Sequence, residues 1–269
     1  MTIIENHLIC QKITDYVSAS PRRLTQRDII REMSLQFSAT RKEINAALRS
    51  LLEANELVYS YIDGHSFMEA SLDKAVRITE RVVLKPPNIS YQPRSNEVVI
   101  SIQSGASFGS GSHPTTRLAL GAIEFALNNI LSFKEARALD IGTGSGVLAI
   151  AAVMMGIDAA IGIDIDPCAR AEAAENVRLN QLEKQIDIQD HDIENISGKF
   201  ALVLANLRYP TLKSLYPKIT ELTEAGGLVV VSGIHQDELP DLLSCYTPNF
   251  VCGWQKSEKN WSAAVFQKR

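Results

Sequence analysis

The chain has 269 residues and a formal net charge of −4, and 45% of its residues are hydrophobic. The length predicts about two globular domains, and the slightly acidic balance argues against a protein that holds nucleic acid through a broad basic surface. The four cysteines form no CxxC pair and the five histidines do not cluster with cysteines or carboxylates, so we expect a reduced, cytoplasmic protein without a metal site.

Residues 1–75 are expected to begin with an amphipathic helix. The first residues, MTIIENHLICQ, carry an early glutamate and no small-residue cleavage site, so no targeting segment is expected. Apolar residues at helical spacing predict the helix over residues 5–17. The residues expected on its apolar face are Leu8, Ile9, Ile13 and Val17.

Two further helices are expected after Thr25 and Thr40. Each threonine is followed three residues later by a carboxylate, Asp28 or Glu43, which matches the spacing of a capping box. The next stretch, ELVYSYIDGHSFMEAS, alternates apolar and polar residues around an Asp-Gly pair and predicts a β-hairpin. Three helices followed by a hairpin predict a winged helix-turn-helix domain.

This predicted domain leaves two functions open. Its third helix offers Arg41, Lys42 and Arg49 to a nucleic acid. Residues 1–75 nevertheless contain nine Lys and Arg against ten Asp and Glu, so the domain is not basic. We therefore favour a module that recruits a partner protein or dimerises over one that binds DNA, because a fold alone does not fix a function.

Residues 76–104 contain a Pro-Pro pair and the turn-forming cluster QPRSN, and we interpret them as a linker with short strands. In residues 105–269, apolar strands alternate with helical patterns, which predicts an α/β fold with a parallel sheet covered on both faces. The longest apolar run, VLAIAAVMMG, is too short to cross a membrane. The expected strands are 136–141, 159–165, 200–206 and 228–234, the expected helices are 146–156, 167–181 and 211–222, and the expected closing antiparallel strands are 250–256 and 261–268. The stretch EAGG is expected to form a turn before strand 228–234, and SEKN is expected to join the two closing strands.

The stretch LDIGTGSGVLAIAA holds a glycine-rich turn between an expected strand and an expected helix. Gly142, Gly144 and Gly146 allow the chain to turn tightly and a ligand to approach the backbone. Their spacing is one residue shorter than the GxGxxG of dinucleotide-binding folds. We therefore expect Gly142, Thr143 and Gly144 to bind S-adenosylmethionine through its methionine portion.

Acidic residues follow the next two strands of the pattern. Asp164 lies 22 residues after Gly142, where a carboxylate can accept hydrogen bonds from both ribose hydroxyls of a nucleotide. The neighbouring Asp166 is expected to cap the helix that begins at Pro167. Further along, Asp192 in QDHDIE is expected to contact the amino edge of adenine.

Asn206 ends the expected strand 200–206, in the stretch LANLRYP. Ligands of open α/β sheets lie beyond the carboxyl ends of the strands, and an asparagine amide offers one acceptor and two donors. We expect Asn206 to act in catalysis by orienting an incoming amine, or to hold the cofactor near its methyl group.

Five motifs in order resemble the ribosomal protein L11 methyltransferase (PrmA) family over residues 80–269: ASFGSGSHPTTRLAL, LDIGTGSGVLAIAA, IGIDIDP, LVLANL and EAGGLVVVSGI. The resemblance implies a Rossmann-like class I S-adenosylmethionine-dependent methyltransferase with a seven-stranded sheet. Carried across motif by motif, it implies cofactor contacts at Thr116, Gly142, Asp164 and Asn206.

The resemblance also implies a loop that folds over the cofactor. In that loop Phe108 would pack against the cofactor and Gly109 would let the loop move. Thr116 would cap the following helix and reach the ligand. His113 is either a base near the methyl acceptor or a residue that structures the loop.

The expected reaction is methylation of a lysine or an α-amine of a protein, with a ribosomal protein among the candidate substrates. The family's ferredoxin-like recruiting domain is replaced here by the predicted winged helix, so the resemblance supports the cofactor better than the substrate. Methylation of a nucleic acid or small molecule is an alternative, although NLRY stands where an Asn-Pro-Pro-Tyr-like motif would be expected. The remaining alternative is a DNA-binding sensor of S-adenosylmethionine.

Overall fold

The computed structural model describes residues 3–20, 24–37, 39–54, 56–62, 65–71, 74–103, 113–128 and 135–269. The chain divides into two compact units, Met1–Lys74 and Ala75–Arg269. Within the described ranges, no helix is both long enough and apolar enough to cross a membrane.

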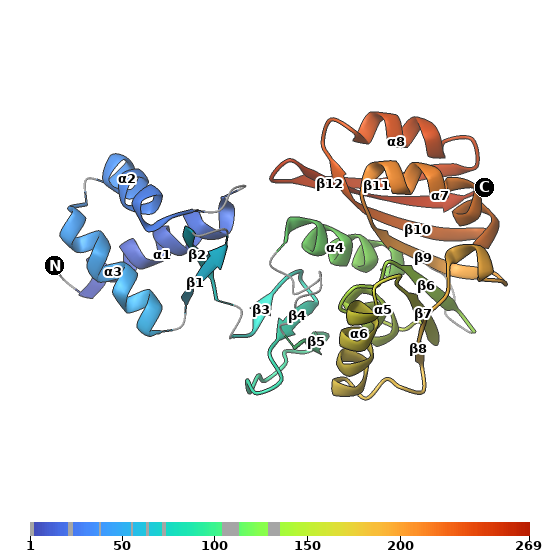
Figure 1. Ribbon diagram of the computed structural model, residues 1–269, viewed down its shortest axis with the longest axis horizontal. Helices are drawn as coiled ribbons and strands as arrows, with labels where there is room; N and C mark the ends of the chain where they lie inside the picture. Colours follow the sequence, from blue (N-terminus) through green and yellow to red (C-terminus); the bar gives the residue numbers. More distant parts are fainter. Residues whose placement is uncertain are drawn as a thin grey trace. The chain divides into compact units, whose positions relative to one another are not determined.

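The N-terminal unit consists of three helices followed by an antiparallel pair of strands (Figure 1). The capping boxes expected at Thr25 and Thr40 are confirmed, because each hydroxyl accepts the backbone N–H three residues later and each carboxylate accepts the threonine N–H. The unit's identity as a winged helix-turn-helix stays a prediction, and its Asp63-Gly64 turn lies outside the described residues. The elements are α1 (Ile3–Ala19), α2 (Gln26–Phe37), α3 (Arg41–Glu53), β1 (Leu57–Ile62) and β2 (His65–Ala70).

The expectation for the apolar face of the first helix is wrong at Leu8, which is 58% exposed. Ile13 is fully buried in the core that α1 forms with α2, α3 and the hairpin, and Ile9 packs against that core. Residues 9 and 13 share a face because they are four positions apart, whereas residue 8 points about 140° away from residue 13 on a helix of 3.6 residues per turn.

The second unit is built on a seven-stranded sheet in the order β11-β12-β10-β9-β6-β7-β8 (Figure 1). Strands β8, β7, β6, β9 and β10 run parallel, and the closing hairpin of β11 and β12 adds the expected antiparallel edge. The Rossmann-like α/β fold predicted from the sequence is thereby confirmed. The strands are β6 (Arg137–Ile141), β7 (Ala159–Ile163), β8 (Ile186–Gln189), β9 (Phe200–Asn206), β10 (Thr223–His235), β11 (Phe250–Glu258) and β12 (Trp261–Lys268).

Helices cover both faces of this sheet, which makes its central strands apolar on both sides. Figure 1 shows α7 and α8 on one face and α4, α5 and α6 on the other. In β9, Leu202 and Leu204 pack into the core on the α4 and α5 side, whereas Val203 and Ala205 pack into the core on the α7 and α8 side. The helices are α4 (Pro114–Asn128), α5 (Val147–Met154), α6 (Pro167–Leu179), α7 (Tyr209–Leu222) and α8 (Leu239–Tyr246), with a short 3-10 helix, η1 (Ile193–Asn195).

Two elements differ from the sequence-based expectation. The EAGG stretch, expected as a turn, belongs to the long strand β10, whose pairing with β9 is irregular between Thr223 and Leu228. The last hairpin turns on Lys259 and Asn260 alone, both with positive φ, rather than on the four residues SEKN. A two-residue turn of this kind matches the twist of its strands, and it lets β11 extend to Glu258 rather than end at residue 256.

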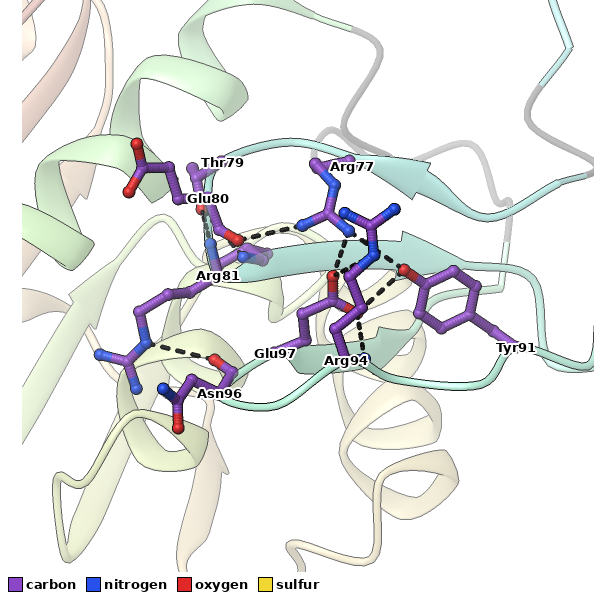
Figure 2. Close-up of polar contacts among 9 residues, drawn as sticks. Arg77, Thr79, Glu80, Arg81, Tyr91, Arg94, Asn96 and Glu97 are labelled. Carbon is purple, nitrogen blue, oxygen red and sulfur yellow. Dashed lines mark hydrogen bonds and ion pairs between the residues drawn. The ribbon is translucent and has the colours of Figure 1, made fainter.

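A three-stranded sheet precedes α4 and consists of β3 (Val76–Arg77), β4 (Val82–Lys85) and β5 (Val98–Ser101). Figure 2 shows the polar network that orders its outer side around Glu97. The Glu97 carboxylate accepts the backbone N–H of Arg94 at 2.8 Å and the Tyr91 hydroxyl at 2.9 Å, and it pairs with the guanidinium of Arg77. The Arg94 N–H bond, together with Arg77 and Tyr91, lowers the pKa of Glu97 to about 2, so this carboxylate is ionised throughout the physiological pH range.

Candidate functional site

The carboxyl ends of β6, β7 and β9 lie side by side at the same end of the seven-stranded sheet. Strand β6 lies between β7, which follows it in the chain, and β9. The chain therefore builds the sheet outward in one direction through β8 and in the other through β10. Ligands of open α/β sheets bind at this type of reversal point.

The glycine turn, residues 142–146, follows β6 directly and lies at this end of the sheet. Gly142, Gly144 and Gly146 have φ values of 70°, 55° and 80°, a region that residues with a Cβ rarely adopt. The N–H groups of Gly142 and Thr143 both donate to the carbonyl of Ile163 at 2.9 Å, which ties the turn to the end of β7.

Asp164 lies directly after β7 and holds the middle of the glycine turn. Its Oδ2 accepts the N–H of Gly144 at 2.9 Å, and its Oδ1 accepts the N–H of Asp166 at 3.0 Å. Each carboxylate oxygen can accept more than one hydrogen bond, so these contacts leave capacity for a ligand hydroxyl. Asp166 itself caps α6 by accepting the N–H of Cys168 at 2.8 Å, which confirms the cap expected from the sequence.

Asp140 is a site residue that the sequence analysis missed. It is fully buried beneath the turn, where its Oδ2 accepts the Thr143 hydroxyl at 2.7 Å and the N–H of Ala149 at 3.2 Å. Its Oδ1 has no hydrogen-bond partner among the described residues. Burial, reinforced by the charge of Asp164, raises the pKa of Asp140 to about 6. The signal was available in LDIGTG, where an acidic residue interrupts an otherwise apolar strand.

Thr143 turns its side chain inward to Asp140 and is 4% exposed. Its hydroxyl is thus engaged beneath the turn. A Cβ on the neighbouring Gly162 would lie 2.9 Å from this hydroxyl, so the absence of a side chain at Gly162 makes room for Thr143.

Asn206 ends β9 beside the glycine turn, as the sequence predicts. A Cβ built on Gly142 would lie 2.6 Å from Leu207 Cδ2, so the turn and the residue after Asn206 are in direct contact. The Leu207 N–H donates to the carbonyl of Ser232 at 3.0 Å. The Oδ1 of Asn206 is buried and has no hydrogen-bond partner in the described ranges.

Thr116 lies in the first turn of α4 rather than at its cap, so the expectation that it caps this helix is wrong. The helix begins at Pro114, and His113 takes the capping position, with its Nδ1 2.9 Å from the Thr115 hydroxyl. Thr116 is fully buried, and among the described residues its hydroxyl has no hydrogen-bond partner. Phe108 and Gly109, the expected loop contacts, lie outside the described residues.

The start of α4 lies next to the carboxyl end of β9, where Asn206 stands. The Ser232 hydroxyl donates to the carbonyl of Thr115 at 2.9 Å, and Ser232 is the register partner of Asn206 across β9 and β10. His113 packs edge-on against Trp261, with ring centroids 5.2 Å apart. Burial lowers the pKa of His113, helped by the positive charges of Arg117 and Lys259.

Asp192 is the most peripheral of the expected site residues. It is exposed, and its Oδ1 accepts the N–H of Glu194 at 3.3 Å as the cap of η1. The nearby Asp190 forms an ion pair with Arg170 at 2.8 Å, and Arg170 also donates to the carbonyl of Asp164 at 2.9 Å. The loop after β8 is thereby tied to the Asp164 loop.

Four buried oxygens of the expected site and its glycine turn lack described partners: Asp140 Oδ1, Ser145 Oγ, Asn206 Oδ1 and Thr116 Oγ1. Buried polar atoms are nearly always hydrogen-bonded in native proteins. Asp140 lies beneath the glycine turn, Ser145 lies within it, and Leu207, which follows Asn206, contacts it, so these oxygens fit a polar ligand that carries donors. In the described part of the chain, no group of three or more His, Cys, Asp or Glu residues is arranged to hold a metal ion.

We expect Gly233→Ala to destabilise the protein by about 3 kcal/mol. Gly233 has a φ of 87°, and a Cβ there would lie 2.5 Å from the carbonyl oxygen of Leu207. Gly226→Ala is the matched control, because Gly226 also has a positive φ in β10 but has no neighbour within 4 Å of its would-be Cβ in the described structure. The control should lose about 1 kcal/mol, as measured by urea-induced unfolding, and equal losses would contradict the contact argument.

A family model described as ribosomal protein L11 methyltransferase (PrmA) matches residues 32–269, a longer stretch than the motifs alone cover. The ribosomal protein L11 methyltransferase of Heliobacterium modesticaldum is 34% identical over 197 residues, which are 72% of this chain and 61% of that protein. The one from Pelobacter propionicus is 35% identical over 161 residues, which are 60% of this chain and 52% of that protein. The aligned part of the chain thus spans about three fifths or less of these relatives' length.

A solved structure agrees with these relatives. The ribosomal protein L11 methylase from Lactobacillus delbrueckii subsp. bulgaricus is 26% identical with a TM-score of 0.65, and the match covers 74% of this chain and all of that one. The motif order, the sheet topology and the family model agree. The chain belongs to the ribosomal protein L11 methyltransferase (PrmA) family.

Proposed function

We propose that the chain is an S-adenosylmethionine-dependent methyltransferase that acts on a lysine or α-amine of a protein, with a ribosomal protein as the candidate substrate. The observation that carries the proposal is the direct contact between the glycine turn, Asp164 and the Asn206 segment at the reversal point of the sheet. The family membership supports the reaction class.

The residues at the carboxyl ends of these strands offer a complementary group for each part of the cofactor. Asp164 supplies acceptors for the ribose hydroxyls, Asp192 an acceptor for the amino edge of adenine, and the turn at Gly142 and Gly144 backbone groups for the methionine portion. Asp140 supplies a buried carboxylate for the cofactor's ammonium group. The assignment of Phe108 and Gly109 to a covering loop rests on the family resemblance.

When bound, the cofactor supplies an electrophilic methyl group on a sulfonium centre. The chain's task is to exclude water and align the acceptor amine with that group. We assign this orientation to the amide of Asn206, and we keep Thr116 as a cofactor contact implied by the family resemblance. The acceptor amine must be neutral to react, and burial favours its neutral form.

The pH dependence of cofactor affinity tests the Asp140 assignment. Because the pKa of Asp140 in the free protein is raised to about 6, its carboxyl is largely neutral below pH 6 and must lose a proton to pair with a cation. We expect the affinity for S-adenosylhomocysteine to fall by up to about tenfold per pH unit below pH 6 and to level off above pH 7. Titration calorimetry from pH 5 to 8 measures this, and Asp140→Asn should flatten the profile; an unchanged profile in that variant would refute the assignment.

We propose that the N-terminal unit recruits the protein substrate and that the protein acts in the cytoplasm. All four cysteines are free thiols in the structure, which suits a reducing compartment. Residues 1–75 contain ten acidic and nine basic residues, a balance that favours a protein partner over a nucleic acid held through a broad basic surface.

Incubation with a radiolabelled methyl donor and a fractionated cell lysate tests the proposed function. Label that is removed by protease and survives ribonuclease is the expected result. Asp164→Ala, assayed at a limiting concentration of the methyl donor, is the control that should incorporate much less label. Label removed only by ribonuclease would shift the acceptor to RNA, and label in neither fraction would rule out a macromolecular substrate in that lysate.

A further inference from the structure

Asn176 in the last turn of α6 and Asn180, the C-cap of that helix, hold the end of β5 through their side chains. The Oδ1 of Asn180 accepts the N–H of Ser101 at 2.9 Å, and its Nδ2 donates to the carbonyl of the same residue at 2.7 Å. The Oδ1 of Asn176, one helical turn earlier, accepts the N–H of Gln103 at 2.9 Å. The two side-chain amides therefore pair with backbone N–H and carbonyl groups of residues 101 and 103, as the backbone of a neighbouring strand would.

Asn176 also reaches the glycine turn, whereas the bonds of Asn180 go to Ser101 and to the carbonyl of Asn176. The Nδ2 of Asn176 donates to the carbonyl of Ser145 at 2.9 Å, and Asn176 is fully buried. Ser145 lies between Gly144 and Gly146 in the turn. A Cβ on Gly146 would lie 3.3 Å from the Cα of Ala173, so the turn packs directly on the backbone of α6.

The other end of β5 is fixed independently. Glu97, directly before β5, is held by Arg77, Tyr91 and the Arg94 N–H in the network shown in Figure 2. The side chain of Glu97 is only 2% exposed despite its charge, because these partners enclose it. Strand β5 is thus held at both ends. Asn176 joins Gln103, just beyond the carboxyl end of β5, to Ser145 in the glycine turn.

We propose that Asn176 is a positioning residue for cofactor binding, which sets the glycine turn by bridging the carbonyl of Ser145 and the N–H of Gln103. This inference rests on the proposed function, because it concerns the same turn. Loss of the bridge frees a buried carbonyl within the turn itself. Loss of the Asn180 bonds loosens the same strand but leaves the turn in place.

Asn176→Ala and Asn180→Ala form a matched pair, since both truncate an asparagine that holds the same strand, one in the last turn of α6 and one at its C-cap. We expect both variants to lower Tm by similar amounts. The Kd for S-adenosylhomocysteine, measured by titration calorimetry, should rise by about tenfold or more in Asn176→Ala and by less than about threefold in Asn180→Ala. Equal changes in the two variants, or no change in Asn176→Ala, would overturn the inference while leaving the proposed function intact.

Hydrogen exchange on the unaltered protein tests the same link and does not depend on a variant that folds. Adding S-adenosylhomocysteine should slow exchange of the Gln103 amide together with that of Gly146, and should affect the Ser101 amide less. An unchanged Gln103 amide would contradict the bridge. If the unaltered protein does not bind S-adenosylhomocysteine at all, both the proposed function and this inference fail.

Discussion

Asn206→Ala is expected to lower kcat about 100-fold while changing the Kd for S-adenosylhomocysteine by less than about threefold. The Asn206 amide lies at the end of β9, and its buried Oδ1 has no hydrogen-bond partner among the described residues. We propose that this oxygen orients the acceptor amine, so its loss removes alignment rather than cofactor contacts. The expected effect is therefore on the rate of methyl transfer.

Single-turnover kinetics with a methyl-accepting protein fraction measure this rate, and calorimetry measures the affinity. Asn195→Ala is a suitable control because Asn195 lies in η1, outside the contacts that join β6, β9 and α4. A kcat for Asn206→Ala within about threefold of the unaltered protein would show that another group aligns the acceptor.

Asp164→Ala is expected to weaken S-adenosylhomocysteine binding by on the order of 2 kcal/mol, or about 30-fold in Kd. Part of this loss comes from the proposed ribose hydrogen bonds. The rest follows from the structure, because Asp164 Oδ2 holds the Gly144 N–H and its loss frees the turn. The effect should appear in Kd and in KM for the methyl donor.

Asp166→Ala separates these contributions from a general loss of stability. Asp166 caps α6 through the Cys168 N–H and does not hold the glycine turn in the described structure. This variant should lose about 1 kcal/mol of stability with little change in Kd. If Asp166→Ala weakens binding as much as Asp164→Ala does, the ribose has been assigned to the wrong carboxylate.

The glycine turn, Asp164 and Asn206 could be predicted from the sequence because each depends on a local pattern. Gly142 and Gly144 follow an apolar strand, and the acidic and amide residues stand where later strands end. Because alternating strands and helices predict a parallel sheet, the carboxyl ends of its strands are expected at the same end of the sheet. The structure places the glycine turn in contact with Asp164 and with Leu207, the residue after Asn206, while the cofactor contacts of these residues stay a prediction.

Asp140 left a partial signal, an acidic residue within an apolar strand, but its significance depends on burial and on its contacts with Thr143 and Ala149. The Asn176 bridge left no such signal, since Gln103 and Ser145 come close to it only in the folded chain. Long-range contacts of this kind leave no spacing pattern in the sequence.

The errors also have physical causes. The EAGG stretch contains two glycines, which favour turns, yet it lies within β10 as an irregularity between the paired residues Thr223 and Leu228. Leu8 was assigned to the buried face of α1 from its apolar character, although its angular position sets it apart from Ile13.

Equilibrium dialysis of the unaltered protein with radiolabelled S-adenosylmethionine tests the central claim, that the glycine turn and Asp164 bind this cofactor. We predict one mole bound per mole of chain, displaced by S-adenosylhomocysteine but not by NAD, with binding strongly reduced in Asp164→Ala. No binding at about 1 mM cofactor, or displacement by NAD instead, would contradict it.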